Sequence, residues 1–310
     1  GIPIHGIIGY DLFKDFIVDI NYSNKIIKFY NPEEYSYKPN KKSQTLPIDV
    51  ISRKAYVNAK VGLKNNEEFD VKLLVDTGSS DAVWLFEDDQ INIPEEYYDD
   101  FLGKGLAGDI YGKRTKINHL KIGGFNLEDA KAAFPDMITY NSIKSLGNRN
   151  GSLGGEVLKR FNIIFDYPNS KITLKKNSNF RKPFHYNISG IDLQHAGVRY
   201  VSEQIASPNG VVFNNEREYG DVQILLESAT KLSVVPEIVV SAIRMGSPAH
   251  GAGLQEGDVI LAVNGKRIHR YKLQEIMHML NDKQGKRVKI LIERYDKDLL
   301  FSFILKDLFK

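Results

Sequence analysis

Two stretches of this 310-residue chain repeat each other, so that Gly6 aligns with Gly151 and Phe29 aligns with Leu174. Each copy begins with an apolar segment bounded by glycines and continues through a short helical stretch into two alternating strands. Aligned glycines together with aligned alternation indicate one structural unit used twice. We therefore expect the two copies to fold alike.

The identities fall at the points where backbone geometry and core packing are most restricted. Apolar character also agrees at most of the positions between them. The identical pairs are Gly6/Gly151, Gly9/Gly154, Lys14/Lys159, Phe16/Phe161, Tyr22/Tyr167, Asn24/Asn169 and Ile27/Ile172.

The segment Asp76-Thr77-Gly78-Ser79 lies between two apolar runs, at residues 71–75 and 82–86. A carboxylate at the end of a buried strand is costly unless hydrogen bonds stabilise its charge. The Thr77 and Ser79 hydroxyls and the backbone amides of a Gly78 turn are suitable donors. The pattern indicates a functional carboxylate, although an ordinary strand-end turn uses the same residue types.

Composition narrows the functional classes. The net charge of +3 gives no basis for predicting a nucleic-acid partner. The absence of cysteine excludes disulfides and thiol chemistry, and the seven histidines show no metal-ligand spacing. No apolar run approaches the length of a membrane span. We expect no metal, no cofactor and no membrane-spanning segment in this chain.

The chain resembles the retropepsin-like and pepsin-like aspartic proteases. In that family each lobe carries Asp-Thr/Ser-Gly early and an apolar-apolar-Gly element late. Asp76–Ser79 matches the early motif, whereas 152–154 matches the late one with Ser152 in place of an apolar residue. The segment 7–9 matches the late element of a preceding lobe. The resemblance implies a mainly β fold, with residues 1–40 as the trailing half of a first lobe and residues 41–180 as a second.

The same resemblance implies an aspartic endopeptidase that hydrolyses polypeptide substrates. Two aspartates would activate a water, with Asp76 as one of them and its partner expected upstream of residue 1. Thr77, Gly78, Ser79 and Gly154 would support the catalytic loop. A glycine-rich hairpin is either a flap over the cleft or an ordinary hairpin, and its candidate flap residues are Gly103, Gly105, Leu106 and Gly108.

The C-terminal part, residues 181–310, resembles a bacterial PDZ domain, which is an α+β, partly open barrel. A strand at 239–243 precedes Gly246–Leu254, where Ser-Pro-Ala caps a short helix, and Gly257–Gly265, which turns into a buried strand. A second helix has one apolar face made of Leu273, Ile276, Met277 and Leu280. An insertion at about 205–235 departs from the usual spacing.

In a PDZ domain a peptide C-terminus adds as a strand beside the second helix. The resemblance places the carboxylate loop at Gly190, Ile191, Asp192 and Leu193, and one wall of the groove at Leu273, Ile276 and Leu280. Asp192 replaces a glycine of the family pattern, and its negative charge opposes a bound carboxylate. The groove therefore either binds peptide C-termini weakly or has only a scaffold role.

An aspartic protease region followed by a PDZ domain resembles bacterial proteases that are exported, which implies a periplasmic or cell-surface location. Two other interpretations stay open. The chain is either a catalytically inactive peptide-binding or scaffold fragment, or it pairs its Asp76 loop with that of a second copy. The half-lobe at residues 1–40 argues against the second of these.

Overall fold

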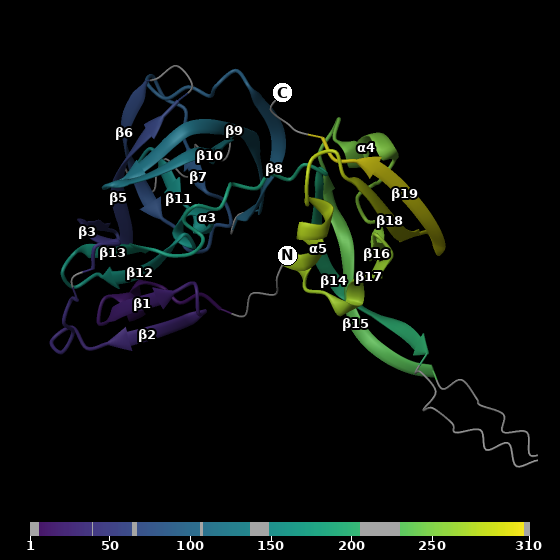
Figure 1. Ribbon diagram of the computed structural model, residues 1–310, viewed down its shortest axis with the longest axis horizontal. Coiled ribbons are helices and arrows are strands. Elements are labelled where there is room, and N and C mark those ends of the chain that lie inside the picture. The colour runs from purple at the N-terminus through teal and green to yellow at the C-terminus, as the bar shows by residue number, and fades with distance from the viewer. Residues whose placement is uncertain are drawn as a thin grey trace, which may run out of the picture. The chain divides into compact units, whose positions relative to one another are not determined.

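The computed structural model describes residues 6–38, 40–63, 67–105, 108–136, 149–204 and 230–306. Their secondary structure is mainly β, which confirms that part of the predicted fold class. The chain divides into an N-terminal unit, Ile4–Ile188, and a C-terminal unit, Ser189–Lys306 (Figure 1). Each unit is described by itself.

The repeat builds a five-stranded sheet in the N-terminal unit. Each copy forms a four-residue helix followed by a hairpin, and the two hairpins pair side by side through β1 and β12. Asp19 lies opposite Ile164, its own repeat equivalent, so the two copies are related by a local twofold axis. The elements are α1 (Tyr10–Phe13), β1 (Ile17–Asn21), β2 (Ile26–Tyr30), β3 (Ser43–Pro47), α3 (Gly155–Leu158), β12 (Phe161–Asp166) and β13 (Lys171–Lys176), with strand order β2-β1-β12-β13-β3.

An eight-stranded sheet forms the rest of this unit. Its short strand β11 lies between β6, to which it is parallel, and β7, to which it is antiparallel. An additional pairing of β5 with β9 curls the sheet upon itself. In their order across the sheet, the strands are β4 (Asp49–Ile51), β5 (Lys54–Gly62), β6 (Glu68–Val75), β11 (Gly151–Leu153), β7 (Val83–Leu85), β10 (Phe125–Pro135), β9 (Gly108–Ile122) and β8 (Tyr97–Gly105).

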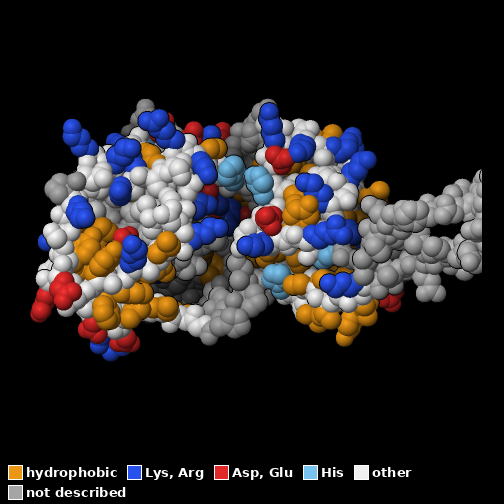
Figure 2. Space-filling model, turned by 60° about the horizontal axis from the view of Figure 1, so that its bottom comes forward, with side chains coloured by type: hydrophobic (Ala, Val, Ile, Leu, Met, Phe, Trp, Pro, Cys, Tyr) orange, Lys and Arg blue, Asp and Glu red, His pale blue; other side chains and the backbone are white. Residues whose placement is uncertain are grey.

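The two copies of the repeat differ in what covers them. Phe161 and Ile172 are 0% and 1% exposed because they pack into the main core of the unit. Their equivalents Phe16 and Ile27 are 37% and 53% exposed. Figure 2 shows hydrophobic side chains gathered at the lower left, over the β1–β2 hairpin. The hairpin therefore keeps an apolar face that nothing in the described residues buries.

The C-terminal unit is a six-stranded sheet with two short α-helices and a 3₁₀ turn. Helix α4 begins at Pro248, behind an N-cap in which Ser247 Oγ accepts from His250 N at 3.2 Å, as the Ser-Pro-Ala motif predicts. The sheet order is β14-β15-β16-β18-β19, with β17 beside β16. The elements are β14 (Ile191–Gln204), β15 (Thr230–Ile243), α4 (Pro248–Ala252), β16 (Val259–Val263), β17 (Lys266–Arg267), η1 (Ile268–Arg270), α5 (Leu273–Leu280), β18 (Arg287–Arg294) and β19 (Lys297–Ile304).

Strand β15 begins earlier than the strand predicted at 239–243, and the insertion at about 205–235 stays a prediction. Residues 230–235 belong to β15, which begins at Thr230 and not at Val239. Apolar and polar residues alternate through 231–234, and residues 230–235 pair with β14 beyond a bulge between His195 and Val198. Residues 205–229 lie outside the described residues.

Candidate functional site

The Asp76 loop connects β6 to β7. The Asp76 backbone N–H donates to the carbonyl oxygen of Leu153 on β11 at 2.9 Å. Asp76 Oδ1 accepts from the N–H groups of Gly78 and Ser79 at 2.9 and 3.2 Å. The half-buried carboxylate is thus held by amides of its own loop, while Thr77 is exposed.

Gly154 packs tightly against this loop. Its N–H donates to Ala82 O at 2.9 Å. A Cβ added at Gly154 would lie 2.3 Å from Asp81 O and 3.0 Å from Ser79 Oγ. Close backbone approach therefore requires glycine at this position. The repeat equivalent, Gly9, has no atom within 4 Å of an added Cβ.

Arg149 is a charged side chain that interacts with Asp76 in the described part of the chain. Burial lowers the pKa of Arg149, and the Tyr56 and Asp76 side chains partly offset this. Arg149 Nη1 donates weakly to Ser152 Oγ at 3.4 Å, and its guanidinium carbon lies 5.5 Å from the centre of the Phe86 ring. An aspartate dyad needs two carboxylates that share a proton. The second carboxylate of the predicted dyad was expected upstream of residue 1, so these contacts do not test it.

A buried ion network lies directly after the loop, and sequence reasoning missed it. Arg114 on β9 donates through Nη1 to Asp81 and through Nε to Asp100 Oδ2, the latter at 2.6 Å. Lys131 Nζ lies 3.5 Å from Asp81 Oδ1, and Trp84 Nε1 donates to Asp81 Oδ2 at 2.7 Å. Although burial raises the pKa of Asp81, Arg114, Lys131 and Trp84 together hold it below its usual value.

The glycine-rich segment forms the hairpin of β8 and β9, in which Gly105 lies opposite Gly108. Gly103 and Gly108 have positive φ of 133° and 131°, which accounts for two of the glycines. A Cβ on Gly105 would lie 2.8 Å from Ile110 Cδ1. Leu106 lies outside the described residues. The role of this hairpin as a flap stays a prediction.

The predicted carboxylate loop begins β14 in the C-terminal unit. Gly190 has φ +78°, and a Cβ there would lie 2.2 Å from Ser247 Cβ, so only glycine fits. Gly190 O accepts from Arg244 N at 2.9 Å, and Ile191 N donates to Ser189 Oγ at 3.3 Å. The loop is therefore fixed against the segment that leads into α4.

The side chains predicted to line the groove differ in exposure. On β14, Leu193 is buried and Asp192 is half-buried. On α5, Ile276 and Leu280 are 0% exposed and pack into the core, whereas Leu273 is half-buried. Leu273 is thus the member of the predicted helix wall that retains accessible surface.

Asn281, which sequence reasoning missed, ties the loop to the end of α5. Its Oδ1 accepts from Ser189 N at 3.0 Å, and its Nδ2 donates to Met277 O at 3.0 Å. The only sequence signal was an asparagine at the C-terminal cap of a predicted helix. The bond places the start of β14 beside α5, which is where a groove between the two elements is required.

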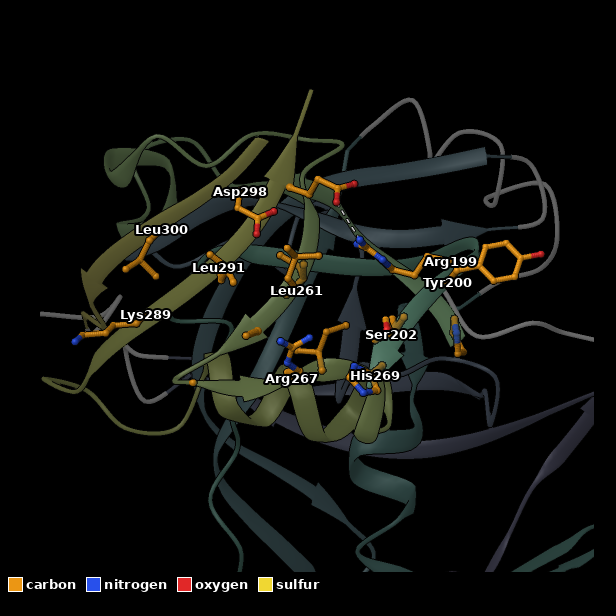
Figure 3. A pocket seen from close by; sticks show the side chains of 17 residues that line it. Arg199, Tyr200, Ser202, Leu261, Arg267, His269, Lys289, Leu291, Asp298 and Leu300 are labelled. Carbon is orange, nitrogen blue, oxygen red and sulfur yellow. Dashed lines mark hydrogen bonds and ion pairs between the residues drawn. The ribbon is translucent and has the colours of Figure 1, made fainter. Parts of the chain in front are cut away.

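A cavity of about 700 Å³ opens on the sheet of the same unit (Figure 3). Its floor includes Leu261, Leu291 and Leu300, and Arg267 and Lys289 stand at its rim. None of these five residues was singled out as a site residue by the sequence. The described residues contain no cluster of His, Asp and Glu able to hold a metal ion. Among the same residues, no helix is long and apolar enough to cross a membrane.

Two solved structures similar to this chain are HtrA-type proteases. One, the HtrA-type protease AlgW with decapeptide, is 12% identical with a TM-score of 0.25, over 80% of this chain and 60% of that one. A variant form of AlgW with decapeptide is 11% identical with a TM-score of 0.29, over 84% of this chain and 80% of that one. Likeness at this level transfers no activity to this chain.

The predicted aspartic endopeptidase finds no support here, since the two similar structures are HtrA-type proteases and not aspartic proteases. Within this chain Asp76 Oδ1 accepts from amides of its own loop, and the aspartate predicted to pair with it was expected upstream of residue 1. The predicted enzyme class is withdrawn, and the role of Asp76 stays an untested prediction.

The resemblance to a PDZ domain is confirmed. Residues 239–294 match the family model for the PDZ domain. The match covers β15 from Val239 onward, α4, β16, β17, η1, α5 and β18. The chain therefore carries a PDZ domain in its C-terminal unit.

Proposed function

We propose that the C-terminal unit binds the carboxyl-terminal ends of polypeptides by adding them as a strand along β14. The observation that carries this proposal is the place of β14 in the sheet. It is the terminal strand in the order of the described strands, with β15 as its one neighbour there. Helix α5 lies alongside it, so a peptide would enter between a strand edge and a helix.

The start of β14 is shaped for such a ligand. Gly190 brings the backbone of the loop close to Ser247, and Asn281 holds the loop at the end of α5. The half-buried Leu273 and Met277 offer apolar contacts along the helix. Backbone hydrogen bonds would supply affinity, and these apolar contacts would supply selectivity.

Asp192 sets an upper limit on affinity. Its half-buried side chain lies within the loop that would receive the peptide carboxylate. Two like charges brought together oppose binding, and the effect grows as water is excluded. We expect weak, transient recognition of free C-termini by the unmodified protein.

The test compares one apolar peptide with a free carboxyl terminus and with an amidated terminus, titrated against the full chain by fluorescence anisotropy. The free acid should bind more tightly than the amide. Asp192→Asn should tighten the free acid several-fold and leave the amide unchanged. Glu256→Gln, which removes an exposed acid outside this groove, is the matched control. Equal affinity for both peptides would refute the proposal, and no binding of either would favour a scaffold role.

For fold alone, we also infer that residues 41–180 form a lobe of the aspartic-protease type. The support is β11, which lies between β6 and β7, and the local twofold axis between the two repeat hairpins. An experimental structure in which the hairpins at 16–29 and 161–174 fail to superimpose would contradict this inference. No catalytic activity is part of it. Export to the periplasm or cell surface likewise stays a prediction, which fractionation of cells would test.

A further inference from the structure

The cavity of about 700 Å³ lies on the face of the C-terminal sheet that points away from its core. Along β18, Val288, Ile290 and Ile292 are 0% exposed. Successive side chains of a strand point to opposite faces, so Lys289 and Leu291 lie on the outward face of the sheet, where both line the cavity (Figure 3). No residue of α5 or of the loop at 189–193 lines this cavity, which makes it separate from the peptide groove proposed above.

Leucines from three neighbouring strands form the floor. Leu261 comes from β16, Leu291 from β18 and Leu300 from β19, and Leu291 lies directly opposite Leu300 in the register. Leu300 is 68% exposed, and Tyr200 on the wall formed by β14 is 69% exposed. Several large apolar side chains gathered in one hollow are a feature of binding surfaces, in contrast to single exposed leucines.

The rim of the cavity is positively charged. Arg199 is already paired with Glu293, with 2.9 Å between Nη2 and Oε2. Arg267 and Lys289 are both exposed, and neither side chain has a hydrogen bond or ion pair with the rest of the described chain. Asp298 is the one further carboxylate among the lining residues. Two such cations beside an apolar floor favour a ligand that is both anionic and apolar.

We propose that this cavity binds an acidic polypeptide segment that carries apolar side chains. The leucine floor would take the apolar side chains, while Arg267 and Lys289 would pair with carboxylates on either side of them. The cavity lies on a sheet face and not at a strand end, so recognition would need no free carboxyl terminus. It would therefore accept an internal segment of a partner, unlike the groove beside β14.

The probe is a short peptide of alternating glutamate and leucine, acetylated at its start, amidated at its end and labelled with a fluorophore. Amidation prevents it from reporting the groove that receives a free carboxylate. Titration of the full-length chain by anisotropy should show saturable binding that weakens as salt is raised, because the contacts are between exposed charges. A peptide with lysine in place of glutamate should not bind.

Two variants and one matched control assign the site. The charge reversal Arg267→Glu with Lys289→Glu should weaken binding by about tenfold or more. Leu300→Ser should weaken it without unfolding the protein, because this side chain is already mostly exposed. Lys283→Glu with Lys306→Glu makes the same charge change at exposed positions outside the cavity and should leave the affinity within about twofold of the original.

Three results would overturn the proposal. The first is no saturable binding of the acidic peptide, and the second is equal binding of the lysine peptide. The third is a charge reversal at the rim that weakens binding no more than the control does. Sedimentation of the unmodified chain and of the rim variant tests another occupant: a dimer abolished by the rim variant would assign the cavity to a second copy of this chain.

Discussion

Removal of the Arg114 guanidinium should destabilise the N-terminal unit strongly. The side chain is 10% exposed and contacts two carboxylates, Asp81 and Asp100, whose side chains are 5% and 4% exposed. Arg114→Met keeps the length and apolar stem of the side chain but leaves both acids without this cation. Breaking a buried ion pair from one side costs about 3–5 kcal/mol of unfolding free energy. We expect a loss in that range at neutral pH.

The assay is urea denaturation followed by tryptophan fluorescence. Trp84 is the only tryptophan of the chain, and its Nε1 donates to Asp81 Oδ2 at 2.7 Å, so the signal reports this part of the fold. Arg181→Met, an exposed substitution of the same kind, should change the unfolding free energy by less than about 0.5 kcal/mol. The double variant Arg114→Met with Asp100→Leu should recover part of the loss, since an uncharged replacement removes one buried acid that has lost this cation.

The stability difference between Arg114→Met and the unmodified protein should depend on pH. In the unmodified protein the pKa of Asp81 is held below its usual value, so its stabilising contribution is present above the unfolded pKa of about 4 and is lost as pH falls through the folded value. Without Arg114, less attraction offsets the cost of burying the charges of Asp81 and Asp100. The variant therefore loses most unfolding free energy at pH values where both carboxylates are ionised. The difference between the two proteins should therefore shrink as pH is lowered. A loss below about 1 kcal/mol, or one that grows in acid, would refute the reasoning.

Three further outcomes follow from local packing. Gly154→Ala should lower the free energy of unfolding by about 1–3 kcal/mol in the same urea assay, because its Cβ would lie 2.3 Å from a backbone oxygen. Gly9→Ala, at the equivalent repeat position, should leave that free energy nearly unchanged. Gly190→Ala should lower the melting temperature of the C-terminal unit, measured by far-ultraviolet circular dichroism, whereas Gly251→Ala in α4 should not, because its added Cβ meets open space. An unchanged melting temperature for Gly190→Ala would show that the loop tolerates a side chain there. Ile27→Lys should leave the unfolding free energy nearly unchanged in the urea assay, because this side chain is 53% exposed, and a large loss of stability would show that it is buried in solution.

Local signals in the sequence predicted local structure well. Alternation in the two repeat copies gave the hairpins β1–β2 and β12–β13, and the Ser-Pro-Ala motif gave the start of α4 with its N-cap. Each of these depends on residues close together in the chain, where period and capping act directly. The PDZ domain was recognisable for the same reason, since its glycines mark turns of fixed spacing.

The function predicted for Asp76 is where a local motif is not enough. The sequence places a carboxylate at the end of a strand, and the structure confirms that amides of its own loop hold it. A short motif carries no information on whether a second carboxylate approaches from elsewhere. In the described residues Asp76 interacts with Arg149, which is 73 positions further along the chain.

The tertiary structure alone decided the contacts that join distant segments. The ladder of β1 with β12 places Asp19 opposite Ile164, and Arg114 reaches Asp81 across 33 positions of sequence. The cavity exists because Leu291 and its neighbours come from different strands in one register. Side-chain alternation fixes which residues share a face of a strand, but the partner strand and its register depend on the whole sheet. The sequence by itself determined the strands and turns of this protein, and the pairing of its strands decided which charges meet and where a ligand has room to bind.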